Sequence, residues 1–168
     1  VRFEEGEGPL LEALPESLVT NGLVLERFHE RLSPVYETVA KVAAQLPSKV
    51  ALIGFAGAPW TVASYMIEGR SSRDFANVKL WAFQHEREFS QLIALLVEAT
   101  AAYLIRQVEA GAEVLQIFDS WAGALAETEF ERWCLEPLAA IVEKVRSRFP
   151  EVPIIAFPRG AGFGYRSV

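Results

Sequence analysis

The sequence predicts an α/β protein in which parallel strands alternate with helices. Three short apolar runs, at 50–55, 113–118 and 152–157, have the length and composition of buried strands. Segments with helical periodicity separate them, and two parallel strands need a crossover of this kind between them. We therefore expect about three parallel strands with flanking helices, in a single domain that covers residues 1–168.

The first helical segment is expected near residues 25–46. Ser33 and Pro34 interrupt it, since serine favours the cap of a helix and proline its first turn. We therefore expect a kink or a second helix start there. The apolar residues of the segment recur at spacings of three and four, which places them on one helical face: Leu25, Phe28, Leu32, Val35, Val39, Val42 and Leu46.

The remaining elements follow in alternation. After the first strand, the small-residue turn at 56–59 leads into a short helix that carries Tyr65. Residues 74–110 are again helical, over a length that fits two helices, and Gly111 fits a C-terminal cap. The second strand, a helix at 127–148 and the third strand complete the chain.

The carboxyl ends of the three strands are the expected place for chemistry. Phe55, Phe118 and Phe157 each close a strand, and a glycine follows each within a few residues. Ligands of parallel sheets bind at these carboxyl ends. We therefore look for functional residues just after each strand.

Composition narrows the function classes. The chain has 22 acidic and 16 basic residues and a net charge of -6, which argues against a nucleic-acid partner. We find neither a signal peptide nor an apolar run of the roughly 20 residues that cross a bilayer, so no membrane partner is expected. A single cysteine, Cys134, fits a reducing compartment, and we expect a cytoplasmic location.

Three strings carry a resemblance to a known family. They are LIGFAGAPWTVASYMIEG at 52–69, GAEVLQIFDSWAG at 111–123 and VPIIAFPRGAG at 152–162. In this order they resemble the uroporphyrinogen decarboxylase family. The resemblance implies a homodimeric (β/α)8 TIM barrel without metal or organic cofactor, which removes the four acetate carboxylates of uroporphyrinogen III to give coproporphyrinogen III. Three strands cannot close an eight-stranded barrel, so we expect this chain to form part of one.

The resemblance also implies site residues. Tyr65 matches the family's active-site tyrosine, whose hydroxyl donates a hydrogen bond in the cleft. Ser120 matches its substrate-binding serine, suited to a carboxylate oxygen of the substrate. The residues expected to line the cleft are Gly57, Ala58, Pro59, Phe118, Asp119 and Arg159.

Each of these residues also has a structural interpretation. Without the resemblance, Tyr65 fits a core position and Ser120 fits a helix N-cap. Asp119 is a candidate to replace the family's catalytic aspartate, but a carboxylate at a strand end also serves as a cap or in a salt bridge. Arg159 fits a fork-like partner for a substrate carboxylate and, equally, a structural role.

Several family features have no counterpart here. The arginine-rich segment, the aspartate under the pyrrole nitrogens and the C-terminal histidine are all missing, and the chain begins with Val1 rather than Met. We therefore expect a piece of a longer enzyme, with unknown catalytic residues and no activity on its own. Two alternatives stay open. One is a zinc-dependent corrinoid or thiol methyltransferase of the same superfamily, although no His-x-Cys pair occurs; the other is a truncated, non-catalytic chain.

Overall fold

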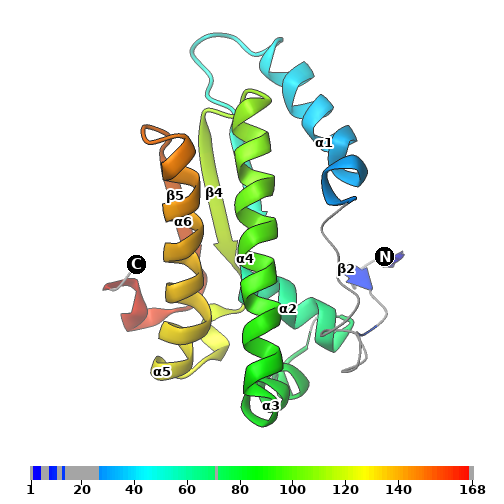
Figure 1. Ribbon diagram of the computed structural model, residues 1–168, viewed down its shortest axis with the longest axis vertical. Helices are drawn as coiled ribbons and strands as arrows, with labels where there is room; N and C mark the ends of the chain where they lie inside the picture. The colour runs from blue at the N-terminus through cyan, green and yellow to red at the C-terminus, as the bar shows by residue number, and fades with distance from the viewer. Residues whose placement is uncertain (1, 5–7, 11–12, 14–26, 71, 167–168) are drawn as a thin grey trace.

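The computed structural model of the protein describes residues 2–4, 8–10, 13, 27–70 and 72–166. The parallel sheet and its covering helices lie between residues 53 and 158 (Figure 1). In chain order, with η marking 3₁₀ and π helices, the elements are β1 (Arg2–Glu4), β2 (Gly8–Leu10), α1 (Phe28–Ala43), β3 (Ile53–Gly57), α2 (Pro59–Glu68), α3 (Ala76–Gln84), α4 (Glu86–Glu109), β4 (Val114–Asp119), η2 (Ala122–Ala124), α5 (Glu127–Phe130), η3 (Glu131–Leu135), α6 (Glu136–Arg148), β5 (Ile154–Pro158) and η4 (Gly162–Arg166).

The expected parallel sheet is present. Its strand order is β3-β4-β5, and both neighbouring pairs are parallel. Ile53 lies opposite Val114, and Leu115 lies opposite Ile154. The strands begin one to three residues later than the apolar runs that predicted them, and β1 and β2 form a separate antiparallel pair. The prediction of three parallel strands with flanking helices is confirmed.

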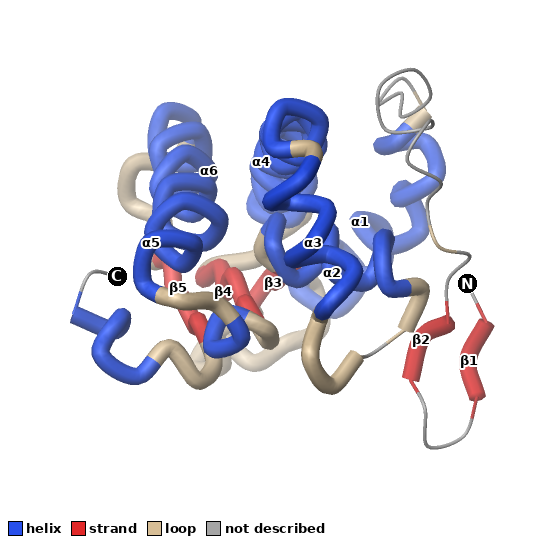
Figure 2. Tube along the Cα trace, turned by 90° about the horizontal axis from the view of Figure 1, so that it is seen from below, coloured by secondary structure: helices blue, strands red, loops and turns tan. Residues whose placement is uncertain are grey.

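One face of this sheet is covered by helices. α4 and α6 pack side by side over it, as both views show (Figures 1 and 2). Leu115 and Ile117 of β4 point into this layer and are fully buried. Within the described residues α4 is the one helix long and apolar enough to cross a membrane, and half of its most apolar stretch is buried inside the fold.

The opposite face of the sheet carries exposed apolar side chains. Phe55 is 58% exposed, and Ile53, Ile155 and Phe157 are also exposed. These residues alternate with buried ones along β3 and with half-buried ones along β5, as the two-residue period of a strand requires. In a barrel of parallel strands this face would turn inward, because the helices occupy the outside.

The first helix differs from the prediction. α1 runs without interruption through Pro34, so of the two expected outcomes, a kink or a second helix start, the second start is wrong. Proline adopts the helical φ angle, but it lacks the N–H that would bond to Glu30 O, and its ring crowds that carbonyl. Tyr36 is the one buried residue described on α1, so water can reach the carbonyl that loses its partner. The helix therefore tolerates the proline.

The later helical segments follow the expected divisions. The stretch predicted over 74–110 is two helices, α3 and α4, with a break at His85, where φ is -126° and ψ is 51°. Gly111 adopts a φ of 113° after α4, which is the conformation that a glycine C-cap supplies. The helix predicted over 127–148 is present as α5, the π-helical turn η3 and α6 in direct succession.

A side-chain amide closes part of the free edge of β3. Ala58 N–H donates to Phe118 O at 2.8 Å, so the even-numbered residues of β3 direct their backbone groups toward β4 and the odd-numbered ones away from it. At odd-numbered Phe55, Gln107 Oε1 accepts from the backbone N–H and Nε2 donates to the backbone O, both at 3.0 Å. Gln107 lies on α4 and is 2% exposed. Its amide forms the two backbone hydrogen bonds at Phe55 that a neighbouring strand would otherwise form.

Replacing Gln107 by leucine is expected to lower the free energy of unfolding by about 2 kcal/mol, because two backbone groups of Phe55 lose their partners. The measurement is urea unfolding of the 168-residue chain, in which β3 has this free edge. Gln91→Leu is the matched control, since Gln91 is an exposed glutamine on the same helix. Equal effects of the two substitutions would contradict the role of the Gln107 amide.

Candidate active site

The carboxyl ends of β3, β4 and β5 meet at one edge of the sheet. In the strand register Gly57 lies opposite Phe118, and Phe118 lies opposite Phe157. Backbone bonds continue this alignment beyond the strands: Arg159 N–H donates to Asp119 O at 2.9 Å, and Gly123 N–H donates to Arg159 O at 3.1 Å. The residues that we predicted to be functional after each strand therefore lie along one rim, at the carboxyl end of the sheet.

Tyr65 lies close to the turn that carries Ser120. α2 begins directly after β3, with Pro59 in its first turn, and brings Tyr65 back over the rim. The Tyr65 ring centroid is 6.0 Å from that of Trp121, the residue after Ser120. Tyr65 and Ser120 are both half-buried. The tyrosine and the serine-bearing turn are thus neighbours at the same end of the sheet.

The other predicted lining residues divide between the two sides of the sheet. Phe118 lies on the exposed face, with its ring 6.1 Å from that of Phe55. Ala58 and Pro59 are buried in packing contacts. Arg159 is exposed, and within the described part of the chain its guanidinium forms no ion pair.

Asp119 lies on the helix side of β4, opposite to the side of Phe118. It is 4% exposed, and Thr61 Oγ1 donates to its Oδ1 at 2.5 Å. Its Oδ2 has no partner of good geometry among the described residues, and Asp119 is one of the residues that line a cavity of about 10 Å³, the size of one water molecule. Burial raises the pKa of Asp119, against the opposing effect of bonds from Thr61, Cys134 and the Trp121 backbone.

The raised pKa of Asp119 predicts a pH dependence of stability. The folded state holds the Asp119 proton more tightly than the unfolded state, whose carboxyl titrates near pH 4. The free energy of unfolding should therefore fall as the pH rises from about 4 through the folded pKa, by up to about 1.4 kcal/mol per pH unit. Asp119→Asn should remove this decline in urea unfolding measured upward from about pH 4, where the unfolded carboxyl titrates. A constant difference between variant and parent across that range would contradict it.

The single cysteine lies beside this carboxyl. Cys134 is buried on η3, and burial together with the nearby Asp119 raises the pKa of its thiol. The thiolate is the nucleophilic and metal-binding form, so this environment disfavours both uses. Within the described residues no three His, Cys, Asp or Glu side chains gather into a group that could hold a metal ion.

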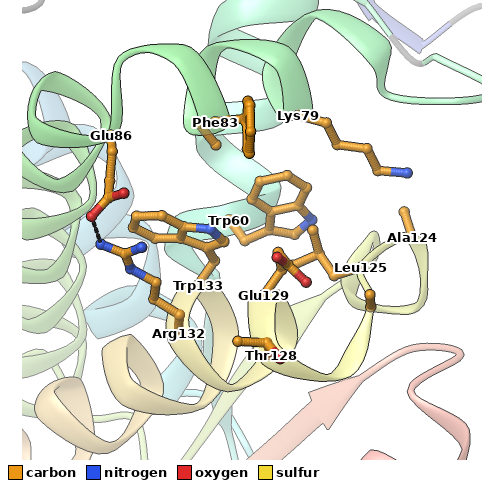
Figure 3. Close-up of a pocket in the computed structure, with 12 residues that line it drawn as sticks. Trp60, Lys79, Phe83, Glu86, Ala124, Leu125, Thr128, Glu129, Arg132 and Trp133 are labelled. Atoms are coloured by element: carbon orange, nitrogen blue, oxygen red, sulfur yellow. Dashed lines mark hydrogen bonds and ion pairs between the residues drawn. The ribbon is translucent and has the colours of Figure 1, made fainter.

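A separate pocket of about 500 Å³ opens in the helical layer between α3, α5 and η3 (Figure 3). Its wall contains the rings of Trp60, Phe83 and Trp133, and the Arg132 guanidinium lies 4.5 Å from the Trp133 ring centroid. Arg132 also pairs with Glu86 across the wall. None of the site residues predicted from the sequence lines this pocket.

Comparison with known proteins now identifies the family. The sequence profile described as uroporphyrinogen decarboxylase (URO-D) matches residues 1–167. The chain belongs to the uroporphyrinogen decarboxylase family. Members of this family fold as TIM barrels, and the three parallel strands with their flanking helices are part of such a barrel.

Individual members of the uroporphyrinogen decarboxylase family support the assignment. A protein named uroporphyrinogen decarboxylase from Chelativorans sp. strain BNC1 is 53% identical over 165 residues, which are 98% of this chain and 48% of that protein. Proteins of the same name from Rhodospirillum rubrum and Mesorhizobium japonicum are each 50% identical over 167 residues, which are 99% of this chain and 48% of those proteins. The chain thus spans about half the length of the curated relatives it matches.

Two residues of this region were missed by the sequence analysis. Thr61 contacts Asp119 although the two are 58 positions apart, and Gln107 contacts Phe55 across 52 positions. Threonine in a helix and glutamine near a helix end carry no local signal of such contacts. The one available hint is that an apolar helix face seldom contains a polar side chain without a buried partner.

Proposed function

We propose that the full-length protein containing this segment is a uroporphyrinogen decarboxylase, which converts uroporphyrinogen III to coproporphyrinogen III. The identity of 53% to a relative of that name, over nearly the whole of this chain, carries the proposal. The position of Tyr65 beside the Ser120 turn, at the end of the sheet where ligands bind parallel folds, is in accord with it.

The reaction needs no external electron sink. Protonation of the pyrrole carbon beside an acetate arm makes the ring cationic, and the electrons of the breaking C–C bond flow to the ring nitrogen as CO2 leaves. A second proton then converts the exocyclic methylene to methyl, and loss of the proton first added restores the pyrrole. Each acetate carboxylate thus consumes one proton and releases one CO2. A protein accelerates such steps by orienting the ring and by placing hydrogen-bond donors and cations around developing charge.

In this proposal the segment supplies one wall of the substrate cleft. Tyr65 donates a hydrogen bond from its hydroxyl, and Ser120 binds a carboxylate oxygen of an acetate or propionate arm. Arg159 is exposed at the same rim, and its guanidinium suits a second carboxylate. Phe118 and Gly57 line the exposed side of the sheet, where a flat apolar ring would pack.

Replacing Tyr65 by phenylalanine tests the proposed site. Loss of one donor to developing charge is expected to lower kcat/KM about tenfold to hundredfold in the full-length enzyme. The measurement is coproporphyrinogen formation from uroporphyrinogen under reducing conditions. Tyr103→Phe is the control, because Tyr103 lies on α4 next to Tyr36 and away from the rim. Unchanged kinetics in the Tyr65 variant would remove this residue from the site.

The same assay separates the alternatives. We expect the 168-residue chain alone to form no coproporphyrinogen and the full-length protein to form it. Product from the isolated chain would contradict the prediction that the segment is inactive by itself. A full-length protein that binds no uroporphyrinogen and makes no product would favour the non-catalytic alternative, and stoichiometric zinc in that protein would favour a methyltransferase.

Further properties follow from the same proposal. A homodimer, a cytoplasmic location and catalysis without metal or organic cofactor are predictions for the full-length enzyme. Sedimentation of the full-length protein tests the first. Metal analysis of the active protein tests the prediction of metal-free catalysis, since activity without bound metal is expected.

A further inference from the structure

We propose that Thr61 and Asp119 act as a positioning pair, which sets the placement of Ser120 relative to Tyr65. The inference rests on the proposed function, because it assigns a role to the two residues behind the proposed substrate contacts. Neither residue is expected to touch the substrate. Both are buried, Thr61 at 3% exposed and Asp119 at 4%.

The pair joins the two elements that carry the proposed contacts. Thr61 lies one helical turn before Tyr65 on α2, so the two residues share one rigid segment. Asp119 ends β4 and directly precedes Ser120. The hydrogen bond of 2.5 Å from Thr61 Oγ1 to Asp119 Oδ1 therefore links the helix that carries Tyr65 to the residue before Ser120.

Two further bonds act at the same place. The Thr61 hydroxyl oxygen accepts from Trp121 N–H at 3.4 Å, so one hydroxyl contacts the residues on both sides of Ser120. Trp60 Nε1 donates to Trp121 O at 3.1 Å. Residues 119 and 121 are thus both tied to the first turn of α2, and Ser120 between them has its backbone held from both sides.

Thr61 provides the hydrogen bond of good geometry to the Asp119 carboxyl, which Cys134 and the Trp121 backbone also contact. No Lys or Arg pairs with Asp119 within the described part of the chain, and its Oδ2 has no hydrogen-bond partner of good geometry there. A buried carboxyl needs hydrogen bonds in place of water. Removal of the Thr61 hydroxyl leaves Asp119 Oδ1 and Trp121 N–H without this partner, so the Ser120 turn is held by fewer bonds to α2.

The first test is Thr61→Val in a full-length enzyme that carries this segment. Valine keeps the shape and removes the hydroxyl, so we expect kcat/KM for uroporphyrinogen to fall about tenfold, while Thr61→Ser, which restores the hydroxyl, stays within about threefold of the parent. Ser64→Ala is the matched control. Ser64 is a buried hydroxyl on the same helix, but it donates to Trp60 O of its own helix at 2.8 Å. The kcat/KM of the Ser64→Ala control should stay within about threefold of the parent value.

A double-mutant cycle distinguishes positioning from general loss of stability. If Thr61 acts through Ser120, then Thr61→Val should lower kcat/KM about tenfold in the parent enzyme. In the Ser120→Ala variant the same substitution should lower kcat/KM less than about threefold. A merely structural role predicts the same factor in both backgrounds. Equal factors, or equal losses in Thr61→Val and Ser64→Ala, would overturn the proposal.

A readout independent of activity keeps the two proposals separable. Hydrogen exchange of the Trp121 amide should accelerate in Thr61→Val and stay unchanged in Ser64→Ala, since the Trp121 N–H loses the Thr61 hydroxyl only in the former. If the protein shows no decarboxylase activity while this exchange difference appears, the proposed function fails and the linkage of the turn to α2 stands. Unchanged exchange in Thr61→Val would overturn the positioning pair whatever the activity.

Discussion

Replacing Trp60 by alanine is expected to lower the free energy of unfolding of a full-length protein that carries this segment by about 3–5 kcal/mol. Trp60 is fully buried, and its ring packs edge-on against Phe89 with centroids 6.1 Å apart. The substitution also removes the Nε1 donor to Trp121 O. It therefore combines a large cavity in the helical layer with an unpaired carbonyl beside the proposed site.

The comparison for this prediction is Phe83→Ala. Phe83 is also a large aromatic residue near the helical pocket, but it is 87% exposed, so its loss is expected to change the free energy of unfolding by less than about 1 kcal/mol. Both values come from urea unfolding at one pH. A Trp60 variant as stable as the Phe83 variant would contradict the packing described here.

Replacing Gly123 by alanine is expected to lower the free energy of unfolding by about 3 kcal/mol. A Cβ atom at Gly123 would lie 2.5 Å from the backbone O and 2.8 Å from the backbone C of Gly160. Both contacts are with backbone, so the loops after β4 and β5 would have to separate. That separation would also break the bond from Gly123 N–H to Arg159 O, which holds the rim together.

The control for this prediction is Gly57→Ala. Its Cβ would approach the end of the Val62 side chain at 3.2 Å, and a side chain can move by a few tenths of an ångström. We expect a loss below about 1 kcal/mol in thermal or urea unfolding. If Gly123→Ala costs no more than Gly57→Ala, the close approach of the two loops is incorrect.

The order of elements was predictable because its signals are local. Spacings of three and four identify a helix, and short apolar runs bounded by turn residues identify strands. The errors in the predicted helix and strand boundaries also have local causes. Pro34 is a helix-breaking signal on average, but an exposed helix such as α1 tolerates one missing hydrogen bond. The strand starts were early because apolar residues such as Val50 precede the pairing in the sheet.

The candidate site was predictable only in part. A rim at the carboxyl ends follows from parallel topology, so Tyr65 and the residues after β4 were expected near one another. Asp119 shows the limit of such reasoning. Its position after a strand made it a candidate for the cleft, yet the structure places its carboxyl among Thr61 and Cys134 behind the sheet.

The amino-acid sequence alone determined the class of fold, the alternation of strands and helices, and the family, since each depends on residues close together in the chain or on an ordered series of motifs. Only the tertiary structure decided that Thr61 meets Asp119, that Gln107 covers the edge of β3 at Phe55, and that the loops at Gly123 and Gly160 touch. The physical reason is that these contacts join residues far apart in sequence. Their geometry depends on how two whole elements pack against each other, and no local pattern of residue types predicts it.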